Sequence, residues 1–323
     1  RTRIVDEAEP LDLTDLIAEE DVVITLTRDG YVKRVLLSSY RRQGRGGRGV
    51  TGITTKEEDL VSQIAVTTTL HKILFFTSRG RVFQLPAYQL IEMQRQSKGV
   101  HLVNLLQLED GEKVINMIPL RDFGEGKYLF FVTAKGIVKK SDLLEFVSIT
   151  KRGIKAINLD EGDELSAVFV TNGQDKVLIA TAKGYGISFS EEELRSMGRA
   201  SRGVKGISLR AKDRVVGASI LNHNLDLLII SSQGMGKRVK MQNFPVHHRG
   251  GKGIILMKFN QPDNEVIGIQ LVSGQEEILI SSQNGTLIRI NCSEISVQGR
   301  ATRGITLVRL YEGDLISSFA LVE

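Results

Sequence analysis

Short apolar runs recur along this chain at a nearly constant spacing, and a turn glycine follows each run. The runs are too short for helices and are typical of buried strands between turns. They are Val22–Leu26, Ile73–Phe76, Leu129–Val132, Val177–Ala180, Leu227–Ile230 and Ile278–Ile280. The turn glycines lie 48 to 56 residues apart and are Gly30, Gly80, Gly136, Gly184, Gly234 and Gly285. Such a period predicts an array of similar structural units.

Each unit is predicted to contain four strands. Asp29-Gly30 and Asn284-Gly285 are strong hairpin signals, and a second strand such as Tyr31–Leu36 follows each turn. A third apolar stretch comes after a triplet of a basic residue, Gly and Val or Ile. A fourth strand closes each unit, at Ile64–Val66, Val114–Ile118, Leu165–Val170, Val215–Ile220, Val266–Leu271 and Leu315–Leu321. Four strands in about 50 residues match a propeller blade, so we expect an all-β fold of six four-stranded blades, in a closed ring or an open spiral.

The repeat defines the expected domain organisation. The repeats start near residues 21, 71, 127, 175, 225 and 276, so residues 21–323 are expected to form one domain. Residues 1–20 form an acidic lead-in, expected to be a linker from a preceding domain, and the first residue is Arg1 rather than Met. The chain is therefore expected to be a fragment of a longer protein.

Composition excludes several classes of protein. A single cysteine, Cys292, permits no disulfide framework and no cysteine-based zinc site. No apolar run approaches the ~18 residues of a membrane span, and no signal peptide is visible, so a cytoplasmic protein is expected. No P-loop, catalytic triad spacing or acidic metal cluster is present. We therefore expect neither catalysis nor a cofactor or metal in this chain.

The positive charge is concentrated in one part of the repeat. The net charge of the whole chain is only +5. The windows between each turn glycine and the glycine of its triplet hold 24 Lys and Arg but only 7 Asp and Glu, a net +17, and the remainder carries −12. Because equivalent windows occupy equivalent places in a repeat fold, a basic band on one part of the surface is predicted. The window charges are uneven, at +6, +2, +2, 0, +5 and +2 in chain order.

The first unit carries the most basic segment, Tyr40–Val50, in which four arginines alternate with four glycines. Glycine permits positive φ angles and close backbone approach, and arginine matches phosphate oxygens with a planar fork. A phosphate-binding loop is therefore favoured. The spacing Gly44-x-Gly46-x-x-Gly49 also matches a dinucleotide-binding fingerprint, but no helix follows it. A disordered tether is a third interpretation, which the position of the segment inside a regular repeat disfavours.

A weaker version of the basic segment, residues 247–253, lies in the fifth unit. Its His247-His248 pair lacks a second cluster at metal-ligand spacing, so a loop or a phosphate contact is favoured over a metal site.

The triplets repeat a basic residue six times at one position. They begin at Arg48, Lys98, Arg152, Arg202, Lys252 and Arg303. The glycine is expected to make a tight turn, and the repeated charge favours a shared anionic partner. Besides the first-unit segment, the predicted contacts with that partner are Lys33, Arg34, Arg41, Arg42, Arg95, Lys98, Lys151, Arg152, Arg199, Arg202, Lys237, Arg238, Lys240, Arg249, Lys252, Arg300 and Arg303.

The first-unit segment resembles the gyrase A box, a Gln-basic-Arg-Gly-Gly-basic-Gly heptad that marks the C-terminal domain of DNA gyrase A. The matching residues are Gln43, Gly44, Arg45, Gly46, Gly47, Arg48 and Gly49. Gly44 departs from the basic residue usual at the second position, and the Arg41-Arg42 pair can compensate. Residues 15–23 also resemble the opening segment of that domain, and the six repeats match its six blades.

The resemblance implies a six-bladed β-pinwheel, in which blades exchange strands, that wraps duplex DNA around its perimeter without sequence preference. In the family this wrap presents a DNA segment of positive handedness for ATP-driven strand passage, which introduces negative supercoils. It further implies a bacterial cytoplasmic, nucleoid-associated location and partnership with the rest of gyrase A and with gyrase B. The catalytic tyrosine, ATP and magnesium would act outside this chain, and the domain itself is expected to be monomeric. The alternatives are the corresponding domain of topoisomerase IV, which acts in decatenation, and a propeller that binds an acidic protein.

Overall fold

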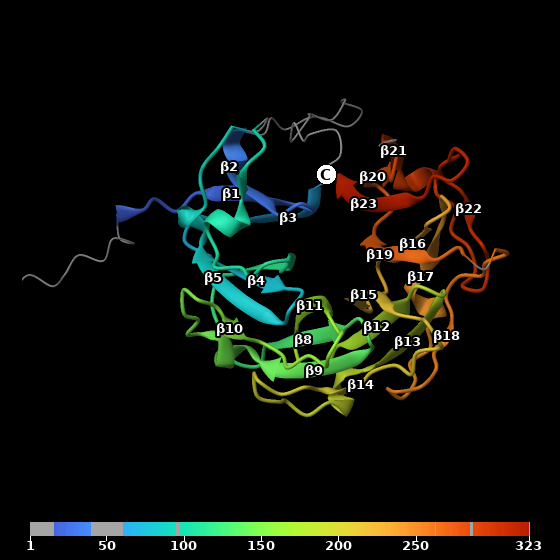
Figure 1. Ribbon diagram of the computed structural model, residues 1–323, viewed down its shortest axis with the longest axis horizontal. Helices are drawn as coiled ribbons and strands as arrows, with labels where there is room; N and C mark the ends of the chain where they lie inside the picture. The colour runs from blue at the N-terminus through green and yellow to red at the C-terminus, as the bar shows by residue number, and fades with distance from the viewer. Residues whose placement is uncertain (1–15, 40–60, 95–96, 262, 285–286, 323) are drawn as a thin grey trace, which may run out of the picture.

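Six antiparallel β-sheets form a ring in the computed structural model of the protein (Figure 1). The structure describes residues 16–39, 61–94, 97–261, 263–284 and 287–322. The predicted hairpin of each unit is present. Its first strands are β1 (Asp21–Thr27), β4 (Lys72–Thr77), β8 (Tyr128–Thr133), β12 (Lys176–Thr181), β16 (Asp226–Ser231) and β20 (Glu277–Ser282). Its second strands are β2 (Tyr31–Leu36), β5 (Arg81–Pro86), β9 (Ile137–Asp142), β13 (Tyr185–Ser190), β17 (Met235–Lys240) and β21 (Leu287–Asn291).

The last strand of each unit lies at the centre of the ring. These inner strands are β3 (Val61–Thr68), β7 (Val114–Leu120), β11 (Leu165–Thr171), β15 (Val215–Ile220), β19 (Val266–Val272) and β23 (Ile316–Val322). Each inner strand contacts the next, and β23 contacts β3. The guanidinium of Arg28 also donates a hydrogen bond to the carbonyl of Ser317 across this junction, at 3.1 Å. The ring is therefore closed, which decides between the two arrangements that the sequence left open.

The short strand after each triplet pairs with the sheet of the preceding unit. In the first sheet the order is β3-β1-β2-β6, and Val100 of β6 pairs with Val32 of β2. These outer strands are β6 (Val100–His101), β10 (Ile154–Lys155), β14 (Val204–Lys205), β18 (Ile254–Ile255) and β22 (Ile305–Thr306). The first five sheets thus have four strands with exchange between units. The sixth sheet has three described strands, and the corresponding residues 50–51 lie outside the described ones.

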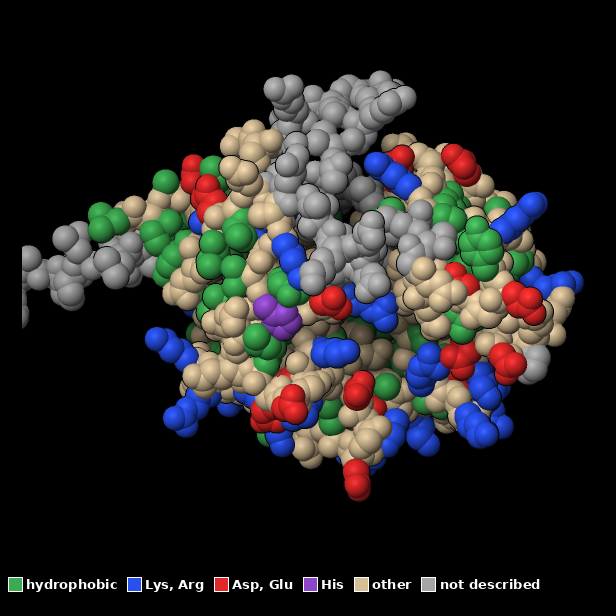
Figure 2. All heavy atoms as spheres, turned by 45° about the horizontal axis from the view of Figure 1, so that its top comes forward, with side chains coloured by type: hydrophobic (Ala, Val, Ile, Leu, Met, Phe, Trp, Pro, Cys, Tyr) green, Lys and Arg blue, Asp and Glu red, His purple; other side chains and the backbone are tan. Residues whose placement is uncertain are grey.

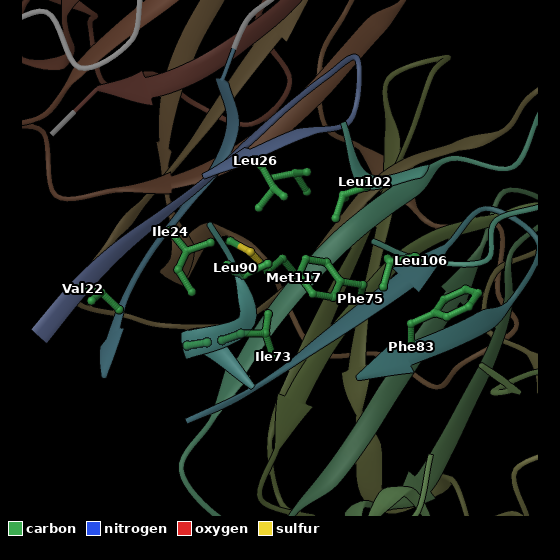
Figure 3. Close-up of a cluster of buried hydrophobic side chains, with 12 residues drawn as sticks. Val22, Ile24, Leu26, Ile73, Phe75, Phe83, Leu90, Leu102, Leu106 and Met117 are labelled. Atoms are coloured by element: carbon green, nitrogen blue, oxygen red, sulfur yellow. The ribbon is translucent and has the colours of Figure 1, made fainter. Parts of the chain in front are cut away.

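Buried side chains fill the spaces between consecutive sheets. Figure 3 shows the first cluster, where Ile24 of β1 and Phe75 of β4 lie close to Met117 of β7. In the second, the rings of Phe76 and Phe131 meet edge to face with centroids 5.8 Å apart. The described residues form five such clusters, from the first pair of sheets to the fifth. The continuous apolar runs of the strands produce these clusters, because successive side chains point to opposite faces and both faces of each sheet are therefore apolar.

Helical structure among the described residues is confined to single 3-10 turns, and no helix there is long and apolar enough to span a membrane. Most of these turns follow the second strand of a unit. They are η2 (Leu37–Ser39), η3 (Ala87–Gln89), η4 (Leu102–Asn104), η5 (Leu143–Phe146), η6 (Glu191–Glu193), η7 (Met241–Asn243) and η8 (Cys292–Glu294).

Candidate nucleic-acid interface

The described residues of the predicted basic windows lie on the outer side of the ring (Figure 1). After its 3-10 turn, each of units 2 to 6 sends a segment along the second strand of the preceding sheet; we call these segments straps. They are strap 2 (residues 90–101), strap 3 (147–155), strap 4 (194–205), strap 5 (244–255) and strap 6 (295–306), of which residues 95–96 lie outside the described ones. Backbone hydrogen bonds attach them, such as Met197 N–H to Lys140 O at 2.8 Å and Arg238 N–H to Ser296 O at 3.1 Å. The straps therefore place their side chains on the rim.

The triplet glycines allow the straps to lie close to the preceding sheet. Gly203 and Gly253 have φ angles of +97° and +69°. A Cβ atom on Gly203 would lie 2.5 Å from Val138 O, and one on Gly253 would lie 2.5 Å from Gly186 O. A larger residue would thus be both strained and in collision with backbone. This confirms the predicted turn role of these glycines.

Several predicted contact residues are exposed on the straps. They are Lys151, Arg152, Arg202, Lys252 and Arg303. Lys and Arg side chains stand around the rim of the described surface in Figure 2. Arg202 forms an ion pair with Asp160, which neutralises part of the charge of strap 4. Lys98 is half-buried, and its ammonium lies 3.6 Å from the ring centre of Tyr31.

A second group of predicted residues is half-buried and fastens the straps. Arg199, Arg249 and Arg300 precede their triplet glycines by four positions. Their guanidiniums donate to backbone carbonyls of the preceding unit, namely Glu145 O at 3.2 Å, Lys205 O at 3.0 Å and Ile255 O at 2.5 Å. These arginines therefore join neighbouring units in addition to any contact with a ligand.

Two predicted lysines are buried instead of exposed. Lys33 is 1% exposed and Lys237 is 0% exposed. The ammonium of Lys33 donates to Ser97 O at 3.0 Å, and that of Lys237 to Arg300 O at 2.6 Å. Their burial is inconsistent with the predicted direct contact with an anionic partner. The strand pattern explains the difference, because the third residue after the turn glycine faces inward beneath the next strap.

The next position on the strands carries buried or paired cations. Arg34 donates to Leu90 O at 3.1 Å and pairs with Glu92 at 3.3 Å. Arg238 donates to Ile295 O at 2.8 Å, and the buried Asp226 pairs with Arg238 at 3.4 Å. These bonds attach strap 2 and strap 6 to the preceding sheets. For both arginines, contact with a partner is therefore secondary to this structural role. Lys240 is exposed and also pairs with Asp226, at 2.9 Å.

The box heptad Gln43–Gly49 lies outside the described residues, as do Arg41, Arg42 and Arg95. Their predicted contacts remain expectations.

Two exposed cations and one buried cation are among those that sequence reasoning missed. Lys155 and Lys205 are exposed on the outer strands, two residues after their triplet glycines. Both lysines follow the triplet glycine at the same distance, and this shared spacing is the sequence signal that could have identified them. Lys139 is 0% exposed and occupies the same strand position as Lys33 and Lys237.

Burial lowers the pKa of Lys139 and of Lys237 from the ordinary 10.5 to about 8. At Lys139 the nearby Glu145 carboxylate partly opposes this effect on the pKa, and Arg199 adds to it. At Lys237 the guanidinium of Arg300 lowers the pKa further. Both lysines therefore lose their positive charge at mildly alkaline pH, where an ordinary lysine is still charged.

The histidine pair of strap 5 is exposed. His248 is almost fully exposed, and its Nδ1 lies 3.4 Å from Glu193. In the described part of the chain, no group of three or more His, Cys, Asp or Glu side chains is arranged to hold a metal ion.

Known proteins share both the repeat and the fold. The family described as "DNA gyrase C-terminal domain, beta-propeller" matches the chain at residues 21–68, 71–121, 127–172, 175–222, 225–273 and 276–323. The chain belongs to this DNA gyrase C-terminal domain family. The resemblance seen in its box and repeats is thereby confirmed at the level of the family.

Relatives of this gyrase C-terminal domain include the DNA gyrase A protein of Clostridium acetobutylicum, which is 47% identical over 310 residues. The DNA gyrase A protein of Halalkalibacterium halodurans is 44% identical over 309 residues. Each alignment covers 96% of this chain but only 37% of the relative, so the chain spans about a third of their length.

Two solved structures have the same fold as this gyrase C-terminal domain. The C-terminal domain of DNA topoisomerase IV superposes with a TM-score of 0.81 at 26% identity, covering 95% of this chain and 94% of the other. The DNA gyrase A C-terminal domain superposes with a TM-score of 0.73 at 26% identity, covering 94% and 99%. The all-β, six-bladed pinwheel predicted from the sequence is confirmed.

Proposed function

We propose that this domain is a non-catalytic module that binds duplex DNA through its phosphates and wraps the DNA around the rim of the ring. The observation that carries the proposal is the recurrence of exposed cations on successive straps at one outer edge. Cations spaced along an arc neutralise successive phosphates and release counterions, which drives binding without a base code. Sharp bending of duplex DNA costs several kcal/mol, and contacts distributed along the arc offset that cost.

In the intact protein, the wrapped DNA would be presented for ATP-dependent strand passage and negative supercoiling. The partners would be the rest of gyrase A and gyrase B, in the bacterial cytoplasm near the nucleoid. The catalytic tyrosine and the sites for ATP and magnesium would lie in those other parts. Relatives 44–47% identical are gyrase proteins, which favours gyrase over topoisomerase IV. Assays of the reconstituted enzyme decide between the two: gyrase would introduce negative supercoils, and topoisomerase IV would act in decatenation.

A gel shift with linear duplex DNA of random sequence tests the binding step. The domain should retard the duplex at low salt, and the logarithm of the binding constant should fall steeply and linearly with the logarithm of the salt concentration. A flat salt response would exclude phosphate contacts. Failure to retard any duplex, together with binding to an acidic protein, would favour the interaction scaffold instead.

A further inference from the structure

The third residue after the turn glycine alternates in character around the ring. It is Lys33, Lys139 and Lys237 in units 1, 3 and 5, and Phe83, Ile187 and Ile288 in units 2, 4 and 6. The three lysines and the first two apolar residues are all at most 1% exposed. Because apolar side chains fill the same position in alternate sheets, packing of the sheet does not require a charge there.

The buried ammonium groups bond to the straps of the following units. The Nζ of Lys237 donates to the carbonyls of Gly299, Arg300 and Thr302 at 3.1, 2.6 and 2.9 Å, and the Thr302 hydroxyl lies at 3.2 Å. All three acceptor residues belong to strap 6. An ammonium has three donors, so strap 6 supplies enough oxygens to satisfy every one of them.

Lys139 makes the equivalent contacts two units earlier. Its Nζ donates to Arg199 O of strap 4 at 2.5 Å and to Ala156 O at 2.6 Å. In sheets 2 and 4 an apolar side chain, Phe83 or Ile187, faces the strap instead. A Cβ on Gly251 of strap 5 would lie 3.3 Å from the side chain of Ile187. The lysines are therefore specific to the attachment of even-numbered straps.

Burial of an ammonium group is unfavourable and is tolerated only when hydrogen bonds satisfy it. The lowered pKa of both lysines is consistent with that unfavourable environment. An isoleucine packs at this position in sheet 4, so the buried lysine is not needed for packing. Its presence in sheets 3 and 5 indicates that the conformation of the strap depends on the ammonium group. Arg202 and Arg303, the exposed triplet cations of straps 4 and 6, lie within three residues of the bonded carbonyls.

We propose that Lys139 and Lys237 are positioning residues: their ammonium groups fix the conformation of straps 4 and 6, and thereby place Arg202 and Arg303 for DNA without touching it. The effect on DNA rests on the proposed function, whereas the hold on the straps does not.

The decisive variant is Lys237→Met, which keeps the unbranched side chain up to the position of Cε and removes the ammonium donors. Ile187→Met, at the same position in an even sheet, is the matched control. In the free protein, hydrogen exchange of the amides of residues 295–306 should accelerate at least about tenfold in Lys237→Met, since bonds to a charged donor are lost. The same amides in Ile187→Met should exchange at the wild-type rate. Unchanged exchange in Lys237→Met would overturn the proposal.

Binding to a random-sequence duplex separates positioning from contact. Lys237→Met and Arg303→Ala should each weaken binding and each lower the salt slope by up to about one, because both remove the contact of Arg303 with a phosphate. Because Lys237 acts through strap 6, adding Arg303→Ala to Lys237→Met should weaken binding by less than about twofold, and its effect should remain additive with Ile187→Met. Additive losses in the double variant, with the salt slope lowered by about two, would make Lys237 a separate contact and contradict the proposal.

Two further variants keep the test independent of the folding of Lys237→Met. Lys139→Met probes strap 4 in the same way, and Thr302→Val removes one acceptor oxygen while preserving the backbone. Each should loosen its own strap only. If the wild-type domain binds no duplex, the proposed function fails, and strap exchange still decides whether the lysines hold the straps.

Discussion

The lysines of the basic windows include exposed and buried ones, and the position in the repeat distinguishes Lys252 from Lys237. Lys252 occupies a triplet on a strap and is exposed, whereas Lys237 lies on β17 beneath a strap and is fully buried. Both contribute equally to a count of charge in the basic window. The net charge of the windows therefore overstates the charge available to a partner on the rim.

The pH dependence of folding stability tests the burial of Lys237. Its pKa in the folded protein is about 8, below the ordinary 10.5, because burial disfavours the charged form. Between these values the unfolded chain binds a proton that the folded chain has released. The free energy of unfolding should therefore rise with pH, by up to about 1.4 kcal/mol per pH unit.

Chemical denaturation below and above pH 8 measures this effect when the wild type is compared with Lys237→Met. The wild type should gain stability relative to the variant as the pH rises above that value. Parallel pH curves for the two proteins would show that Lys237 keeps its ordinary pKa.

At the scale of the elements, the sequence was sufficient to predict the hairpins and inner strands. The predicted strands Val114–Ile118 and Leu165–Val170 correspond to β7 and β11, because buried strands and turn glycines leave strong local signals. The residues alone did not reveal that each outer strand belongs to the preceding sheet, which only the family resemblance implied. In a repeat protein, an outer strand can pair with the second strand of its own unit or with that of the preceding unit. The local sequence pattern is the same in both cases.

The candidate site was predicted less completely than the fold. The triplet cations Lys252 and Arg303 are exposed as expected. The buried Lys33 and Lys237 were not distinguished from them, because each is followed directly by an arginine on its strand and both faces of the strand are covered. Burial there depends on the strap of the next unit, which is distant in sequence.

The attachment of the outer strands can be tested at a triplet glycine. Gly253 has a φ of +69°, and a Cβ there would lie 2.5 Å from Gly186 O. Gly253→Ala should reduce the free energy of unfolding by about 2–3 kcal/mol through backbone strain and collision. Hydrogen exchange of β18 should accelerate along with it.

Gly198→Ala is the matched control on a neighbouring strap, since nothing lies within 4 Å of its Cβ position. This variant should change the free energy of unfolding by no more than about 0.5 kcal/mol. Equal destabilisation by both substitutions would mean that the close approach at Gly253 is unimportant.

At the scale of the whole molecule, closure of the ring brings units 5, 6 and 1 together. The contact between β23 and β3 makes the first and last sheets neighbours. Even when the buried Lys33 and Lys237 are left out, the windows of units 1 and 5 carry the largest charges, +5 and +4. DNA is therefore expected to be held most tightly along this part of the rim.

Matched alanine substitutions test that uneven grip. Lys252 of unit 5 and Lys151 of unit 3 are both exposed strap lysines. Each substitution should lower the salt slope by about one, but Lys252→Ala should weaken duplex binding more, because its surroundings are more positive. The measurement is duplex affinity at several salt concentrations. Equal losses of affinity would contradict a localised grip.

Wrapping itself is the central claim, and the topology of circular DNA reports it most directly. Relaxed circular DNA is incubated with the domain, treated with a nicking-closing enzyme, and deproteinised, and its linking number is then measured. We expect a shift in the positive sense that grows with protein concentration. Replacement of Gln43–Gly49 by alanines should abolish the shift while leaving part of the binding to linear duplex. An unchanged linking number at protein concentrations that saturate linear duplex would contradict wrapping.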